Sequence, residues 1–186
     1  MTVGRGPAAR MVADLAQLAS TDTVVDIGCG PGTAVRVAAR RSAAATGVDP
    51  SPASLRLARW ITARHGIRNA TFLPGTAERL PVGDASATVI WALSSFHHWD
   101  DPPTALVEIR RVLRSGGRLL IAERRADPGA RGHARHGIDQ EAANQLVEAL
   151  REAGFDGTRG EVHGSGRTTR RVVRASAPHD GRTPGN

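Results

Sequence analysis

The feature that most constrains the fold is a short apolar run, residues 23–27, that leads directly into a glycine-rich stretch. Its valines and isoleucine, bounded by polar residues and glycines, predict a buried strand, and residues 33–41 then follow as a helix. Between them, Gly28, Gly30 and Gly32 permit positive φ angles and let a ligand approach the backbone closely. Because ligands of doubly wound sheets bind at the carboxyl ends of strands, we expect a binding site at this turn.

The rest of the chain alternates strand-like runs with amphipathic helices. Helices are expected at 6–20, 51–66, 103–114 and 140–153, and strands at 46–48, 70–73, 88–92 and 118–122. Two weaker strand signals, at 155–162 and 168–175, flank Gly164-Ser165-Gly166, which favours a closing hairpin. This order predicts an α/β fold with a doubly wound parallel sheet and an antiparallel edge. We expect one domain over 1–176 and a disordered, polar tail over 177–186.

Composition bears on the compartment and the partners. The formal charge is +7, but arginine supplies all 25 basic residues, and the chain has no lysine and no tyrosine. This pattern is typical of genome-wide compositional bias, so nucleic acid is not expected as a partner, while another anionic partner stays open. Cys29 is the single cysteine and cannot form an internal disulfide, and no run approaches the ~20 apolar residues of a membrane span. We therefore expect a cytoplasmic protein with no membrane span.

Two acids beside the glycines indicate the kind of ligand. Dinucleotide-binding folds use G-x-G-x-x-G, whereas this chain has G-x-G-x-G with Asp26 two residues before the first glycine. A carboxylate in that place repels a pyrophosphate and suits a cationic ligand, such as an ammonium or a sulfonium. Asp49 ends the next predicted strand, 17 residues after Gly32, where an acid can accept hydrogen bonds from both hydroxyls of a ribose.

Five ordered segments carry a resemblance to a known family. They are D-I-G-C-G-P-G at 26–32, G-V-D-P-S at 47–51, G-T-A-E-R-L-P at 75–81, W-A-L-S-S-F-H-H-W at 91–99 and L-R-S-G-G-R-L-L-I at 113–121. Together they resemble the class I S-adenosylmethionine-dependent methyltransferases, and most closely the group with the ubiquinone/menaquinone-type and other small-molecule enzymes. The resemblance covers about 24–123. It implies a Rossmann-like, three-layer αβα fold with a seven-stranded sheet of order 3-2-1-4-5-7-6, strand 7 being antiparallel.

The resemblance also implies S-adenosylmethionine as the cofactor and a set of residues around it. The glycine turn lies against its methionine and ribose parts, Asp49 binds the ribose, and Asp26 holds the ammonium directly or through water. Segments 50–51 and 76–78 lie near the adenine, and 92–93 pass under the methionine. The cofactor-binding residues are thus expected to be Asp26, Gly28, Cys29, Gly30, Gly32, Asp49, Pro50, Ser51, Thr76, Ala77, Glu78, Ala92 and Leu93.

The acceptor side is less specified by the sequence. We expect methyl transfer by in-line displacement to a small molecule beside the end of strand 88–92, near the arginine-rich segment 124–137. No catalytic residue is assigned. His97 and His98 fit either a base or a pocket wall, and without H-x-x-x-H or C-x-x-C no metal is expected. Segment 124–137 is short, so a cover for the acceptor is either missing or supplied by a second subunit, as in a homodimer.

Two other functions stay open at this point. One is a cofactor-binding protein of the same fold that is non-catalytic or depends on a partner. The other is a nicotinamide-dependent oxidoreductase, against which the glycine spacing and Asp26 count.

Overall fold

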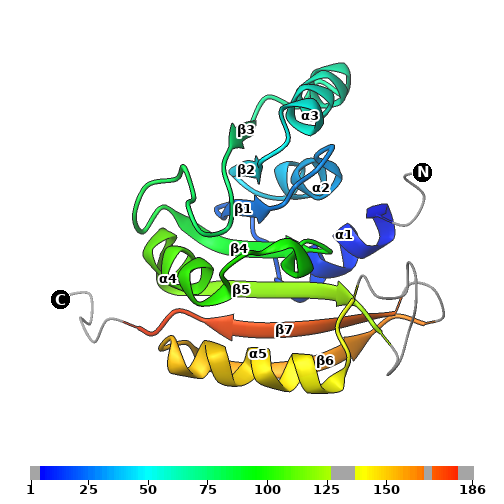
Figure 1. Cartoon of the computed structure of the whole chain (residues 1–186). Coiled ribbons are helices and arrows are strands. Elements are labelled where there is room, and N and C mark those ends of the chain that lie inside the picture. Colours follow the sequence, from blue (N-terminus) through cyan, green and yellow to red (C-terminus); the bar gives the residue numbers. More distant parts are fainter. Residues whose placement is uncertain (1–4, 127–136, 166–168, 180–186) are drawn as a thin grey trace.

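The computed structural model describes residues 5–126, 137–165 and 169–179. In this part of the chain, seven strands form one sheet in the order β3-β2-β1-β4-β5-β7-β6 (Figure 1). The strands are β1 (Thr23–Ile27), β2 (Ala44–Asp49), β3 (Ala70–Pro74), β4 (Ala87–Leu93), β5 (Leu113–Arg124), β6 (Asp156–His163) and β7 (Arg170–Ser176). The helices are α1 (Arg5–Leu15), α2 (Thr33–Ala39), α3 (Pro52–Arg64), α4 (Pro102–Val112), α5 (Gln140–Glu152) and the 3₁₀ turn η1 (Phe96–His98). The pairs among β1 to β5 are parallel and β7 is antiparallel to β5 and β6, so the predicted fold is confirmed.

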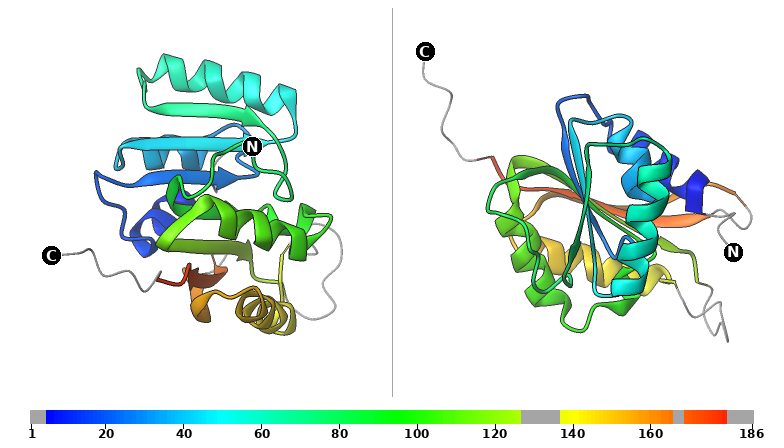
Figure 2. Two further views of the ribbon diagram at one scale, coloured as in Figure 1. Left: turned by 90° about the vertical axis from the view of Figure 1, so that its left-hand side faces the viewer. Right: turned by 90° about the horizontal axis from the view of Figure 1, so that it is seen from above.

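Helices cover both faces of the sheet and give the fold two apolar cores. One core lies between the sheet and α4 and α5, and includes Ile90, Ile109 and Leu150. The other lies between the sheet and α1, α2 and α3, and includes Val35 and Trp91. The view from above in Figure 2 shows the two helix layers on opposite sides of the twisted strands. Alternate residues of each strand therefore face different helix layers, which decides where each site residue points.

The predicted helix ends at residues 20 and 114 are wrong, the first because of a positive φ angle and the second because of strand pairing. Helix α1 ends at Leu15, because Gln17 has a φ of 50° and turns the chain towards β1 before residue 20. Helix α4 ends at Val112, and Leu113 already pairs with Ala87 as the start of β5. Gly116, expected to follow the helix, lies inside the strand with a φ of 69°. The predicted strand at 118–122 is therefore only the second half of β5.

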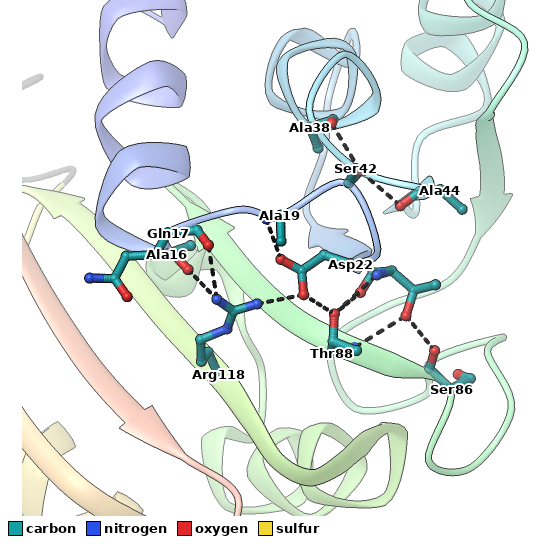
Figure 3. Close-up of polar contacts among 11 residues, drawn as sticks. Ala16, Gln17, Ala19, Asp22, Ala38, Ser42, Ala44, Ser86, Thr88 and Arg118 are labelled. Atoms are coloured by element: carbon teal, nitrogen blue, oxygen red, sulfur yellow. Dashed lines mark hydrogen bonds and ion pairs between the residues drawn. The ribbon is translucent and has the colours of Figure 1, made fainter.

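A buried acid ties the amino ends of the strands to helix α1 (Figure 3). Asp22 accepts hydrogen bonds from the Ala19 N–H at 2.8 Å, the Thr88 hydroxyl at 2.6 Å and the Arg118 guanidinium at 2.5 Å. Arg118 also donates to the Ala16 carbonyl at the end of α1. Burial raises the pKa of Asp22, but these hydrogen bonds outweigh it and hold the pKa below its usual value. This network is at the edge opposite the glycine turn and is structural.

The carboxyl end of the described chain continues the packing of β7. Ala177 is fully buried, and its N–H donates to the Gly117 carbonyl at 2.8 Å. The predicted disordered tail, 177–186, therefore begins too early, and its residues 180–186 lie outside the described part. Within the described residues, no helix is both long and apolar enough to cross a membrane.

Candidate functional site

The glycine turn after β1 has a backbone that only glycine adopts easily. Gly28, Gly30 and Gly32 have φ angles of 69°, 52° and 75°. The N–H groups of Gly28 and Cys29 both donate to the Val48 carbonyl, which fastens the turn to the end of β2. A Cβ atom on Gly28 would lie 2.3 Å from the Ser95 Cβ. Positive φ angles and this close approach together explain why the sequence has glycines here.

Asp49, at the end of β2, joins the glycine turn to the start of helix α3. One carboxylate oxygen accepts the Gly30 N–H at 2.8 Å and the other accepts the Ser51 N–H at 2.9 Å. The cap of α3 is Ser51, whose hydroxyl accepts the Ser54 N–H, so Asp49 is not needed as a cap. Each oxygen of a carboxylate can accept a second hydrogen bond. Asp49 is thus a fixed, 8% exposed carboxylate with acceptor capacity beyond the bonds that build the turn.

A cavity of about 560 Å³ opens at the carboxyl ends of β1, β2 and β4. This volume is typical of small-molecule and cofactor sites. Half or so of the predicted cofactor residues line it, and these are Gly28, Gly30, Asp49, Pro50, Thr76, Ala77 and Glu78. Its wall also contains residues that the cofactor prediction left out, among them Ser54, Ser94, Ser95, His98, Trp99 and Asp100. The sequence segments 26–32, 47–51, 75–81 and 91–99 therefore meet at one place.

The other predicted cofactor residues lie behind or beside this cavity. Asp26, Cys29 and Leu93 line a small adjoining space of about 20 Å³ under the turn. A Cβ atom on Gly32 would contact the Phe72 ring, and Ala92 is fully buried within β4. Ser51 caps α3. The structure thus places these side chains in support of the turn rather than in the wall of the larger cavity.

Cys29 has the environment of a packing residue. Its sulfur covers Gly47 of β2, where an added Cβ would lie 2.7 Å from it. Burial, and then the nearby Asp26 and Asp49 carboxylates, raise the pKa of the Cys29 thiol far above its usual range. A thiol that stays protonated is a poor nucleophile, so the role of Cys29 is to pack the turn against β2.

Glu78 fixes the loop that follows η1. Its carboxylate accepts the N–H groups of Asp100 at 3.0 Å and Asp101 at 3.3 Å. Burial raises the pKa of Glu78, but hydrogen bonds from its own backbone, from Thr76 and from this loop outweigh burial. The pKa of Glu78 is therefore below its usual value. Glu78 therefore holds together the two segments that form the outer rim of the cavity.

The sequence interpretation missed a buried acid, Glu123, at the end of β5. Its side chain is 0% exposed, and it accepts the Phe96 N–H at 2.7 Å. The second oxygen lies 3.2 Å from the Nδ1 atom of His97. The hydrogen bond with Glu123 is the main reason why the pKa of His97 is raised. An acid directly after the apolar run 119–122 is the signal that could have identified it.

The region expected for the acceptor does adjoin the cavity. Ser95 donates its hydroxyl proton to the Ile27 carbonyl at 2.7 Å, and this bond locks the end of β4 to the end of β1. His98 and Trp99 line the cavity, and the Trp99 ring packs edge-on against Phe96. Most of the arginine-rich segment, 127–136, lies outside the described residues. In the described ranges, no group of three or more His, Cys, Asp or Glu side chains is placed to hold a metal ion.

Comparison with known proteins gives a consistent assignment. A methyltransferase domain model matches residues 25–121, which is more than half of the chain. The O-methyltransferase rstn1 of Aspergillus nomiae is 38% identical over 108 residues, which cover 57% of this chain and 48% of that protein. The 27-O-demethylrifamycin SV methyltransferase of Amycolatopsis mediterranei is 34% identical over 114 residues, 60% of this chain and 42% of its own. The chain thus spans a little under half the length of these curated relatives.

Solved structures share the fold over nearly the whole chain. A SAM-dependent methyltransferase from Aquifex aeolicus superposes with a TM-score of 0.76 at 18% identity, covering 91% of this chain and 89% of that one. At this identity the likeness shows a common fold.

Proposed function

Because the chain belongs to the class I S-adenosylmethionine-dependent methyltransferases, we propose that it transfers a methyl group from S-adenosylmethionine to a hydroxyl of a small molecule. The observation that carries this proposal is the Asp49 carboxylate, held by the glycine turn at the wall of a cavity of about 560 Å³. The choice of oxygen as acceptor rests on the two curated relatives, both named for O-methylation. Assignment to the ubiquinone-type group remains a prediction, as do a cytoplasmic location and a homodimer.

The residues present fit the cofactor. Asp49 supplies acceptors for a ribose diol, since both of its oxygens are oriented by backbone N–H groups. Thr76, Ala77 and Pro50 line the same cavity, where we place the adenine. Asp26 supplies a buried negative charge on the side where the ammonium is expected. When bound, S-adenosylmethionine supplies a methyl group that its sulfonium has already activated.

The main contribution of the protein's own residues is to hold the methyl donor and the acceptor in the right relative position. Holding two reactants in line can supply roughly 7–11 kcal/mol of a bimolecular barrier. Ser95 fixes the end of β4 next to the glycine turn, and Glu123 fixes the η1 turn through the Phe96 N–H. His97 is hydrogen-bonded to Glu123, so we assign it a positioning role for the wall formed by His98 and Trp99.

The direct test is label transfer from methyl-labelled S-adenosylmethionine to a panel of phenols and hydroxy acids, with release of S-adenosylhomocysteine as the second readout. We expect oxygen-linked label with at least one acceptor class, and at least a tenfold lower turnover in His97→Ala with unchanged affinity for S-adenosylhomocysteine. Binding of S-adenosylhomocysteine without transfer to any acceptor, including a fractionated small-molecule extract, would favour the non-catalytic or partner-dependent alternative.

A further inference from the structure

Two arginines stand directly opposite each other where β5 and β7 pair. The antiparallel register places Arg124 against Arg170 at the carboxyl end of β5, the sheet edge at which the parallel strands β1, β2 and β4 also end. Arg170 is 5% exposed, whereas Arg124 is exposed to solvent. Like charges directly opposite on neighbouring strands are destabilising, and a buried cation is costly unless it is paired. This pair therefore requires an explanation.

Within the described residues, the Arg170 guanidinium has neither a full set of hydrogen-bond acceptors nor an ion-pair partner. Its Nη1 donates to the Thr169 carbonyl at 3.0 Å, while its buried Nε has no hydrogen-bond partner in the described part of the chain. Among the same residues, no carboxylate forms an ion pair with it. Burial is the main reason why the pKa of Arg170 is lowered, and Arg124 lowers it further, while Glu123 raises it only in part. Glu123 already accepts hydrogen bonds from the η1 segment and lies on the other face of the sheet.

The position of the pair points to the acceptor rather than to the cofactor. Leu93, Ala122 and Val172 are register partners across β4, β5 and β7, and all three pack in the core on the α1 side. Arg124 is two residues after Ala122 in β5, and Arg170 is two residues before Val172 in β7. Because side chains alternate along a strand, both arginines face the same side of the sheet as this row. Leu93 lines the small space beside Gly28. Because β5 separates β4 from β7 in the sheet, β7 lies about 10 Å from β4. Neither arginine is among the described residues that line the larger cavity, so the pair lies beside the expected cofactor position and not within it.

We propose that Arg170, assisted by Arg124, binds an anionic group of the methyl acceptor, either a carboxylate or a phosphate. The proposal rests on the proposed methyl transfer and adds the substrate class. An anion between the two guanidinium groups would neutralise the buried charge, satisfy the Nε–H and remove the cross-strand repulsion. The planar fork of arginine suits carboxylate and phosphate, which accept two parallel hydrogen bonds.

The test uses inorganic phosphate as the probe and thermal unfolding as the readout, at constant ionic strength set with sodium chloride. Four proteins are compared: wild type, Arg170→Met, Arg124→Gln and Arg174→Met. Arg174 is the matched control, because it lies on the same strand and face but is ion-paired with Glu161 at 3.6 Å. We expect half-maximal stabilisation of the wild type to need at least fivefold less phosphate than Arg170→Met, with Arg124→Gln in between and Arg174→Met like the wild type.

Stability without phosphate separates a binding role from a structural one. Arg170→Met removes an unpaired buried charge, so its melting temperature without phosphate should equal or exceed that of the wild type. Arg124→Gln changes an exposed side chain and keeps the test valid if Arg170→Met does not fold. Phosphate protection that is equal in all four proteins, or that is lost in Arg174→Met, would overturn the proposal.

Two further arms identify the source of the anion. Calorimetry with S-adenosylhomocysteine should give the same affinity, within twofold, for the wild type and Arg170→Met; a weaker variant would assign Arg170 to the cofactor's own carboxylate and contradict the proposal. No binding by the wild type would instead contradict the proposed function itself.

The second arm compares acceptors. With an active acceptor class, the wild type should prefer free acids such as 4-hydroxybenzoate over their methyl esters, and Arg170→Met should lose this preference. An equal preference for the free acids in both proteins would contradict the proposal, because Arg170 would then not bind the acceptor.

Discussion

Replacing Asp49 by alanine should weaken the binding of S-adenosylhomocysteine by about 1.5–3 kcal/mol, or roughly 10- to 150-fold in the dissociation constant. The loss has two physical sources. The ribose hydroxyls lose a charged acceptor, and the N–H groups of Gly30 and Ser51 lose the carboxylate that orients them. Isothermal calorimetry measures the constant, and circular dichroism confirms that the variant is folded.

Asp84→Ala is the control for this experiment. Asp84 is an exposed acid that pairs with Arg111 away from the cavity, so its removal changes the net charge equally without touching the site. We expect its affinity to stay within twofold of the wild type. A folded Asp49→Ala variant with an unchanged dissociation constant would show that Asp49 serves only to build the turn.

The second large effect is expected for Gly28→Ala. The φ angle of 69° costs an alanine about 1–2 kcal/mol, and the new Cβ would lie 2.3 Å from the Ser95 Cβ and 2.8 Å from its hydroxyl. Overpacking of this kind costs about 1–3 kcal/mol more, so the free energy of unfolding should fall by about 2–5 kcal/mol. Affinity for S-adenosylhomocysteine should fall more than tenfold, because relief of the clash must move either the turn or the end of β4.

Gly66→Ala is the matched control for the backbone cost alone. Gly66 has a similar φ of 65°, but an added Cβ there meets no atom within 4 Å. Urea unfolding should therefore show a loss of only about 1–2 kcal/mol for this variant. The double variant Gly28→Ala/Ser95→Gly should recover part of the lost stability, since it removes the atoms that the new Cβ meets. If the alanine variants at Gly28 and Gly66 unfold at the same urea concentration, the close approach of Gly28 to Ser95 does not limit the turn.

Local patterns were sufficient for most of the fold. The glycine turn, the alternation of strands and helices, and the Ser51-Pro52 helix start depend on residues close together in the chain, and all are found in the structure. Alternation alone predicts a parallel sheet but no strand order, which came from the resemblance. The helix ends at Leu15 and Val112 were missed because they depend on the φ angle of Gln17 and on the pairing of Leu113 with Ala87.

The site was predicted in part for the same reason. Residues at or just after the end of a strand, such as Asp49 and Thr76, fall at the cavity because the carboxyl ends of parallel strands share one edge. Asp26 and Cys29 are contiguous with the turn, yet the pleat and the turn direct their side chains beneath it. The position of Glu123 after an apolar run was a usable signal, but its contact with the η1 turn was not predictable, and neither was the place of Arg170, which depends on the register of β5 against β7. Both contacts join residues that are far apart in the sequence, so no local sequence pattern predicts them.

The claim on which the account depends is that this cavity binds an S-adenosyl cofactor rather than a nicotinamide dinucleotide. Calorimetric titration of the wild-type chain with S-adenosylhomocysteine and, separately, with NADH tests it most directly. We predict one-to-one binding of S-adenosylhomocysteine and no measurable heat with NADH, because the Asp26 carboxylate and the G-x-G-x-G spacing disfavour a pyrophosphate. Tight binding of NADH, with no heat on addition of S-adenosylhomocysteine, would contradict the account.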